Sequence, residues 1–310
     1  MKKYDVVGLG MATLDILAQT PRLHNSNDCF PIATIEMQGG GPVATALVAL
    51  SRLGARCQYL GPLAKDDTAR QITAELEKYD ISLQFCPQRE NGVSSISVIL
   101  VEQSNGQRAI LYQKSTVDNL LPEEVPADLI ANARSLHLDG FFTPAAIQAA
   151  QIARQHGVLV SFDGGAGEFM WEELSQLLPL VDILVVARQF AQQSTGVENL
   201  LDAGPTLLTQ YKNQQVVITD GEHGSWYWDK DSHFHQPAFN VDVVDTTGAG
   251  DTFHGAYLYA CLQPDWTPQF RLKFASAVAA LKCTKMGGRK GIPTLLETLA
   301  FLEKNQQPSS

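Results

Sequence analysis

The chain has 310 residues, of which 45% are hydrophobic, so it is long enough to fold as one large domain with a substantial core. Its net charge of −10 argues against a nucleic-acid partner, because proteins that bind a phosphate backbone carry basic patches. The five cysteines form no CxxC pair, and no apolar run is long enough to cross a bilayer, so we expect no zinc site, disulfide framework or membrane partner. A soluble protein of the cytoplasm is the expectation.

Short β-type segments alternate with helical segments along most of the chain. Buried strands are predicted at residues 4–9, 135–138, 158–162, 181–186 and 216–219. Helices are predicted at residues 42–53, 67–79, 144–156, 251–261 and 271–284. This alternation predicts an α/β fold in which helices cover both faces of a mostly parallel central sheet, giving three layers.

Two regions break the alternation. Residues 93–103 and 107–114 are joined by Asn105-Gly106, a strong signal for a tight hairpin. Residues 16–38 lack helical periodicity and contain β-type fragments. We expect these regions, about 16–38 and 93–114, to form a small β-sheet lid within a single domain that spans residues 1–310. An ordinary edge hairpin is the alternative.

Candidate ligand-binding residues follow several predicted strands, which is where open parallel sheets bind ligands. Asp15 comes after the first strand and its turn, and Asp163 follows the strand at 158–162. The sequence Thr-Asp-Gly at 219–221 ends a further strand, and three glycines at 39–41 precede a helix. Turn chemistry explains any one of these features, but their convergence at one end of one sheet predicts a site.

The run Asp-Thr-Thr-Gly-Ala-Gly-Asp at residues 245–251 carries the strongest chemical signal. It places small residues where a helix begins, and the first N–H groups of a helix are unpaired and lie at its positive end. An anion can therefore approach closely, with a carboxylate beside it. A phosphate held there and a carboxylate that takes a hydroxyl proton are the requirements of phosphoryl transfer. A capped glycine turn is the alternative.

Other motifs in the sequence do not predict a binding site. Gly8-Leu9-Gly10 resembles the start of a dinucleotide fingerprint, but Thr13 stands at the third glycine position, and the chain contains no P-loop. The histidines without metal-ligand spacing are expected at the surface or in turns: His24, His223, His233, His235 and His254.

With these motifs in order along nearly the whole chain, the sequence resembles the ribokinase-like (PfkB) carbohydrate kinases. The matching segments are residues 8–15, 39–44, 53–55, 219–224, 245–258 and 274–293. The resemblance implies a ribokinase-like fold with a β-sheet lid that often mediates dimers. It also implies transfer of the γ-phosphoryl group of ATP, with Mg²⁺, to a hydroxymethyl group of a sugar.

The resemblance implies roles for individual residues. Asp251 would be the catalytic base, and the anion hole would be formed by Gly248, Ala249 and Gly250. Asp245 and the carbonyl of Thr247 resemble a site for a monovalent cation such as K⁺. The substrate-binding positions would be Asp15, Gly40, Gly41, Thr45 and Phe141. The ATP-binding positions would be Thr219, Gly221, Gly224, Ala280 and Gly287.

Three features of the sequence depart from the family pattern. Thr45 replaces the sugar-binding Asn, and Ala187 and Phe190 stand where an Asn-x-x-Glu pair usually supports magnesium. Gly-Gly-Ala-Gly replaces the Asn and Arg that commonly follow Asp163. The closest similarity within the family is to the sulfofructose kinase and ketohexokinase type of branch.

The expected substrate is nevertheless a neutral keto-hexose or furanose. Cys29 and Phe141 stand where sulfofructose kinases carry a Lys and an Arg, and a sulfonate without a cation would be costly to bury. Sulfofructose stays an alternative because Arg22, Arg108 or Lys114 could supply the charge. A nucleoside kinase, with Phe141 and Phe142 stacking on a base, and a non-catalytic sugar or nucleotide sensor are further alternatives.

Overall fold

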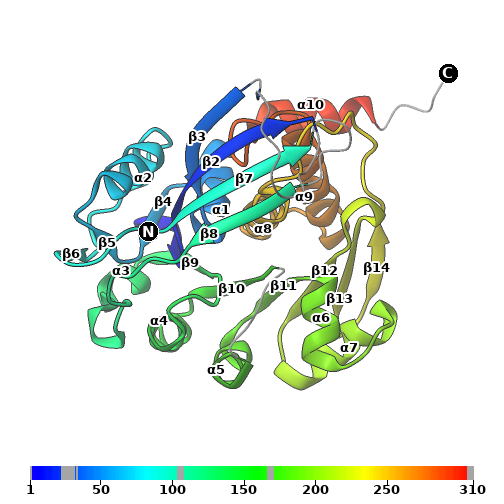
Figure 1. The fold of residues 1–310 in the computed structure, drawn as a ribbon. Helices are drawn as coiled ribbons and strands as arrows, with labels where there is room; N and C mark the ends of the chain where they lie inside the picture. The colour runs from blue at the N-terminus through cyan, green and yellow to red at the C-terminus, as the bar shows by residue number, and fades with distance from the viewer. Residues whose placement is uncertain (1, 22–31, 33, 103–107, 166–170, 306–310) are drawn as a thin grey trace.

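The computed structural model of this chain describes residues 2–21, 32, 34–102, 108–165 and 171–305 (Figure 1). Its large sheet has eight strands in the order β14-β13-β12-β11-β10-β9-β1-β4. The strands from β4 to β12 in this order are parallel, whereas β13 and β14 are antiparallel. The strands of this sheet are β1 (Tyr4–Leu9), β4 (Cys57–Leu60), β9 (Ala133–Leu138), β10 (Leu159–Gly164), β11 (Ile183–Ala187), β12 (Gln215–Thr219), β13 (Ser225–Asp229) and β14 (His233–Gln236).

Helices cover both faces of this sheet, as predicted (Figure 1). One face carries α3 (Ala127–Ala131), α4 (Thr143–Gln155), α5 (Trp171–Leu177), α6 (Arg188–Thr195) and α7 (Leu200–Tyr211). The other face carries α1 (Pro42–Arg52), α2 (Asp67–Glu77), α8 (Ala249–Cys261), α9 (Pro268–Cys283) and α10 (Leu295–Lys304). In the described part of the chain, no helix combines the length and the apolar character needed to cross a membrane.

The helix that begins at the 245–251 run is held firmly in the core. Its neighbour in the core is α1, which carries apolar residues on nearly all sides. Residues 43–50 of α1 are buried, as is typical of a helix inside a protein. Gly255 lets α8 approach α1 closely, since a Cβ there would lie 2.3 Å from the carbonyl oxygen of Ala46. The start of α8 is therefore fixed relative to the carboxyl ends of the parallel strands.

The predicted second sheet is present, with the strand order β3-β2-β7-β8 (Figure 1). Its strands are β2 (Thr13–Thr20), β3 (Thr34–Gly40), β7 (Ile96–Glu102) and β8 (Arg108–Gln113). Strands β7 and β8 form the antiparallel hairpin, and its Asn105-Gly106 turn lies outside the described residues. We call this sheet the lid. Two short strands, β5 (Leu63–Ala64) and β6 (Gln88–Arg89), form a separate pair.

The lid extends further than predicted at both ends of the first region. Strand β2 begins at Thr13, and β3 continues to Gly40, because these two residues still pair across the strands. Asp15, expected after the first strand and its turn, and Gly40, expected just before a helix, are therefore strand residues. Since side chains alternate along a strand, Asp15 shares one face of the lid with its neighbours Gln38 and Ser97.

Candidate active site

The first turn of α8 forms the expected anion-binding end. Gly248 is the N-cap and has a φ of +70°, in the left-handed region that favours glycine. The N–H of Ala249 donates back to the carbonyl of Thr246 at 3.2 Å, whereas the N–H groups of Gly250 and Asp251 have no acceptor within the helix. A Cβ on Gly250 would meet nothing within 4 Å, so a ligand can approach these N–H groups.

Asp251 lies in this first turn with an environment that shifts its proton affinity. Burial of the carboxyl group is the largest influence and raises its pKa, and the charge of Asp15 adds to the rise. The positive charges of Arg108, Arg289 and Lys282 oppose it. Asp15 and Arg108 belong to the lid, Lys282 to the end of α9 and Arg289 to the segment after it, so the fold gathers the lid and the C-terminal part of the chain around one carboxylate.

The loop before α8 is held by the side chain of Asp245. This residue is fully buried, and its carboxylate accepts hydrogen bonds from the N–H groups of Thr247 and Gly287, both at 2.8 Å. Its carbonyl oxygen accepts from Nζ of Lys282 at 2.8 Å. Asp245 thus contacts both Thr247 and Gly287, and the cation-binding role expected for Asp245 and Thr247 stays a prediction. The contact of Lys282 with this loop was not expected from the sequence.

The predicted sugar-binding residues meet at the base of the lid. Asp15 is 7% exposed and accepts a hydrogen bond from Oγ1 of Thr13 at 2.8 Å. Gly40 lies directly against it, since a Cβ there would be 2.0 Å from Oδ2 of Asp15. Gly41 has a φ of +94° and a Cβ there would lie 2.4 Å from the carbonyl of Met11. Burial raises the pKa of Asp15.

Arg289 completes this group and was missed in the sequence. Its side chain is 1% exposed, donates from Nη2 to the carbonyl of Gly40 at 2.8 Å, and lies 3.3 Å from Oγ1 of Thr45. Its Nη1 has no partner in the described part of the chain, and neither has the buried amide of Gln38 nearby on the lid. In the sequence Arg289 stands beside Lys290, which reads as an exposed basic pair. Only the fold shows that it is buried.

Asp139 is a second residue that the sequence analysis missed. It follows β9 directly, and its carboxylate accepts hydrogen bonds from the N–H groups of Met11, Val43 and Phe141 at 2.8, 3.3 and 3.1 Å. Burial raises the pKa of Asp139 to about 7, although these three bonds act in the opposite direction. The signal that could have identified it in the sequence is the pair Asp139-Gly140, directly after the predicted strand at residues 135–138.

His254 corrects an expectation. We expected a surface or turn histidine, but it lies on α8, is 3% exposed, and has Nε2 3.2 Å from Oδ1 of Asp163. Burial lowers the pKa of His254 well below its usual range and raises that of Asp163. The expectation failed because burial of this helix face is decided by packing. His223, His233 and His235 are exposed, as expected, and His24 lies outside the described residues.

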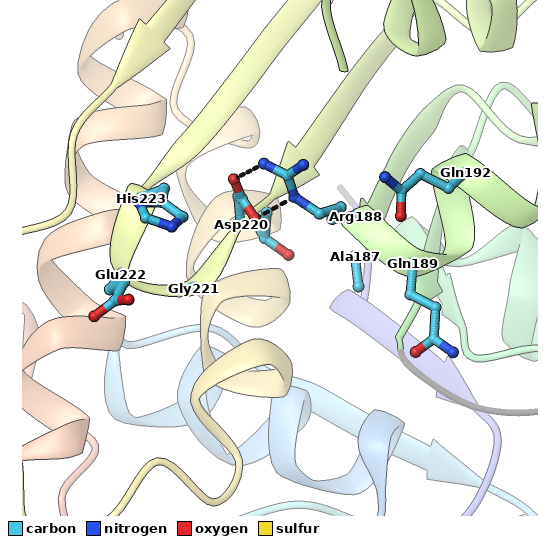
Figure 2. Close-up of a pocket in the computed structure, with 9 residues that line it drawn as sticks. Ala187, Arg188, Gln189, Gln192, Asp220, Gly221, Glu222 and His223 are labelled. Atoms are coloured by element: carbon cyan, nitrogen blue, oxygen red, sulfur yellow. Dashed lines mark hydrogen bonds and ion pairs between the residues drawn. The ribbon is translucent and has the colours of Figure 1, made fainter. Parts of the chain in front are cut away.

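A pocket of about 630 Å³ opens at the carboxyl ends of β11 and β12 (Figure 2). Thr219 and Gly221, two of the predicted ATP-binding positions, line it, whereas Gly224 turns the chain towards β13 and Ala280 lies on α9. Figure 2 shows Arg188 reaching across to Asp220, with Nε 2.5 Å from Oδ1. The pocket therefore contains one arginine, which is paired with Asp220, together with the carboxylate of Glu222.

Two of the positions that depart from the family pattern, Ala187 and Phe190, lie in different surroundings. Phe190 is fully buried and packs on Trp171, with 5.0 Å between the ring centroids, so no carboxylate reaches the pocket from this position. Ala187 ends β11 at the pocket rim. Phe141 is 43% exposed beside Asp139, and its substrate role stays a prediction. Cys29 and Arg22 lie outside the described residues.

The lid contacts the anion-binding loop directly. Nη1 of Arg108, on β8, donates to Oγ1 of Thr246 at 2.7 Å. The first turn of α8 therefore brings together three groups: the carboxylate of Asp251, the unpaired N–H groups of the helix and the guanidinium of Arg108 from the lid. This arrangement can accept a proton from a hydroxyl and stabilise negative charge on a transferred group.

Comparison with known proteins agrees with this chemistry. A family model described as pfkB family carbohydrate kinase matches residues 1–295. Fructokinase-1 of Zea mays is 29% identical over 296 residues, which cover 88% of this chain and 90% of that protein. The structure of Arabidopsis thaliana ribokinase complexed with ribose and ATP has a TM-score of 0.80 and 24% identity, covering 97% and 99% of the two chains. Fructokinase with bound ATP from Xylella fastidiosa has a TM-score of 0.83 and 21% identity, covering 99% and 100%. The predicted ribokinase-like fold is confirmed.

Proposed function

Because this chain belongs to the pfkB family of carbohydrate kinases, phosphotransferases that use an alcohol group as acceptor, we propose that it transfers the γ-phosphoryl group of ATP to a hydroxymethyl group of a neutral keto-hexose or furanose. The observation that carries this proposal is Asp251 in the first turn of α8, directly beside the unpaired N–H groups of that turn. Fructose is the first sugar to test, since relatives across most of the chain are named fructokinases.

In the proposed reaction, Asp251 takes the proton of the attacking hydroxyl group. Its pKa, raised by burial, makes it a better base than an exposed carboxylate. The N–H groups of Gly250 and Asp251 then stabilise the charge on the transferring phosphoryl group. Asp15 holds the sugar hydroxyls at the base of the lid, with Gly40 and Arg289 fixing the position of its carboxylate.

The nucleotide would occupy the pocket beside Thr219 and Gly221, with its phosphates directed to the start of α8. Arg188 supplies a positive charge along this path. The residues present do not fit the usual magnesium arrangement, because Ala187 and Phe190 offer no ligand, and no cluster of three His, Cys, Asp or Glu side chains suited to a metal occurs among the described residues. We propose that Mg²⁺ arrives bound to the nucleotide phosphates.

The alternatives differ in what the acceptor pocket must contain. A sulfonated sugar needs a free cation, and Arg108 is the lid residue placed to provide it. A nucleoside would use the exposed ring of Phe141. A sensor would have no need of a base, so the open first turn of α8 with Asp251 in place favours an enzyme.

The test is an ADP-release assay with fructose, ribose, sulfofructose and nucleosides as acceptors. We expect turnover with a neutral sugar, and a loss of kcat of about 10²–10⁴-fold in Asp251→Asn with ATP binding retained. Asp242→Asn, an exposed carboxylate just before the same loop, is the matched control and should behave as the wild type. Saturable ATP binding without turnover on any acceptor would favour the sensor and refute the proposal.

We also propose that the lid mediates a homodimer. Its outer face carries a row of apolar side chains straight across the sheet, in which Met37, Ile16, Val98 and Leu111 are paired neighbours. Met37 is 51% exposed and Leu111 60% exposed. A second copy of this chain suits such a face because a two-fold axis would bury the same apolar row from both sides. A cytoplasmic location stays a prediction from the sequence.

A further inference from the structure

A buried lysine lies behind the anion-binding loop. Lys282, in the last turn of α9, is fully buried, and its Nζ donates to the carbonyl oxygen of Asp245 at 2.8 Å. Lysine is almost never fully buried unless its charge is paired, because removal of an ammonium group from water is costly. Burial lowers the pKa of Lys282, and the charge of Arg108 acts in the same direction, whereas the charges of Asp245 and Asp251 favour its charged form.

The ammonium group contacts the residue that the family resemblance connects with a monovalent cation. All three side-chain and carbonyl oxygens of Asp245 are engaged, the carbonyl by Lys282 and the carboxylate by the N–H groups of Thr247 and Gly287. A K⁺ ion on the same carbonyl would lie close to a buried ammonium of like charge. These residues therefore do not fit a bound K⁺ at Asp245.

We propose that the ammonium group of Lys282 takes the place of the monovalent cation, so that this enzyme carries its own internal cation and does not depend on K⁺. The inference rests on the proposed kinase function. An ammonium group carries the same single charge as K⁺ and also binds carbonyl oxygens, although it does so by donating hydrogen bonds where K⁺ would coordinate them.

The position of Lys282 indicates what its charge does in the site. The loop that it holds leads from Asp245 directly to Gly248, the N-cap of α8, so its bond fixes the backbone whose next N–H groups receive the phosphoryl group. Its charge also acts on the Asp251 carboxylate. Lys282 is thus a positioning residue that acts through the loop. The buried hydroxyl of Thr247 has no partner among the described residues, so K⁺ itself has to be included in the test.

The experiment compares the wild type, Lys282→Met and Lys285→Met in buffers that contain K⁺, Na⁺ or tetramethylammonium at equal ionic strength. Met keeps the length of the apolar side chain without the charge, and Lys285 is an exposed lysine one turn away that serves as the matched control. We expect the wild type and Lys285→Met to give the same kcat with all three cations. We expect Lys282→Met to lose about tenfold or more of kcat in tetramethylammonium and to recover part of it in K⁺.

The melting temperature is measured alongside, because it needs no turnover. A cation that binds only the folded state stabilises it, so K⁺ should raise the melting temperature of Lys282→Met but not that of the wild type. A wild type whose kcat or melting temperature rises specifically in K⁺ would overturn the inference, even where Lys282→Met does not fold. A folded Lys282→Met with wild-type kcat in tetramethylammonium would also overturn it. Absence of turnover on every acceptor, with a K⁺-independent wild-type melting temperature, would refute only the proposed function.

Discussion

The buried His137 leads to a quantitative prediction for stability. It lies on β9 with no exposed surface, its Nδ1 is 3.1 Å from Oγ of Ser161, and its Nε2 has no partner among the described residues. The ring centroid of His254 is 6.4 Å away. Burial lowers the pKa of His137 to about 4, so the imidazole is neutral in the folded protein across the physiological range.

The sign and size of the effect follow from the two protonation equilibria. The unfolded chain binds a proton at His137 below its ordinary pKa of about 6.5, whereas the folded protein does not do so until about pH 4. The contribution to the free energy of unfolding is therefore complete above about pH 6.5 and is lost as the pH falls towards 4. At 1.36 kcal/mol for each pKa unit, the loss is about 2 kcal/mol at pH 5 and about 3 kcal/mol at the end of the window.

Urea denaturation of His137→Gln at about pH 8 and about pH 5 measures this loss. The variant is expected to be less stable than the wild type at the higher pH, because Gln fills the buried site less well. This deficit should shrink by about 2 kcal/mol at the lower pH, since the variant has no imidazole to titrate. His233→Gln, at an exposed position on β14, should show no such change. An equal deficit of His137→Gln at both pH values would refute the reasoning.

Three further predictions concern the site and the lid. Gly40→Ala pushes a Cβ to 2.0 Å from Oδ2 of Asp15, so kcat/KM for the sugar should fall by about 100-fold while KM for ATP is kept; an unchanged kcat/KM for the sugar would contradict this. Arg188→Ala removes the one lysine or arginine among the described residues that line the pocket proposed for the nucleotide, and KM for ATP should rise by about tenfold without a change in the sugar KM. Leu111→Glu places a charge on the outer lid face and should give a monomer in sedimentation velocity, where a monomeric wild type would exclude the dimer.

The large sheet and the start of α8 could be predicted because their signals are local. Short apolar runs define the strands, and the order of small residues before Asp251 defines a helix start that binds anions. The limits of the lid were less predictable, since Asp15 and Gly40 belong to strands only through their pairing with other strands. Pairing of this kind involves no local sequence signal.

The buried charges could not be predicted. Arg289 and Lys282 each stand near another lysine or arginine in the sequence, which is typical of an exposed segment. Their burial depends on the partners that the fold brings to them, a carbonyl of Gly40 for one and of Asp245 for the other. His254 was misjudged for the same reason, because the polar partner that holds it, Asp163, is distant in the sequence.

The bond between Arg289 and Gly40 joins residues 249 positions apart in the sequence. During synthesis, therefore, the proposed acceptor site cannot be completed until Arg289 has left the ribosome, because Gly40 is made long before its partner. A nascent or truncated chain with a largely formed β-sheet would still lack the contact that sets the position of Asp15. Closing so long a loop is a late event in folding, so competence to bind the acceptor would appear only at the last stage.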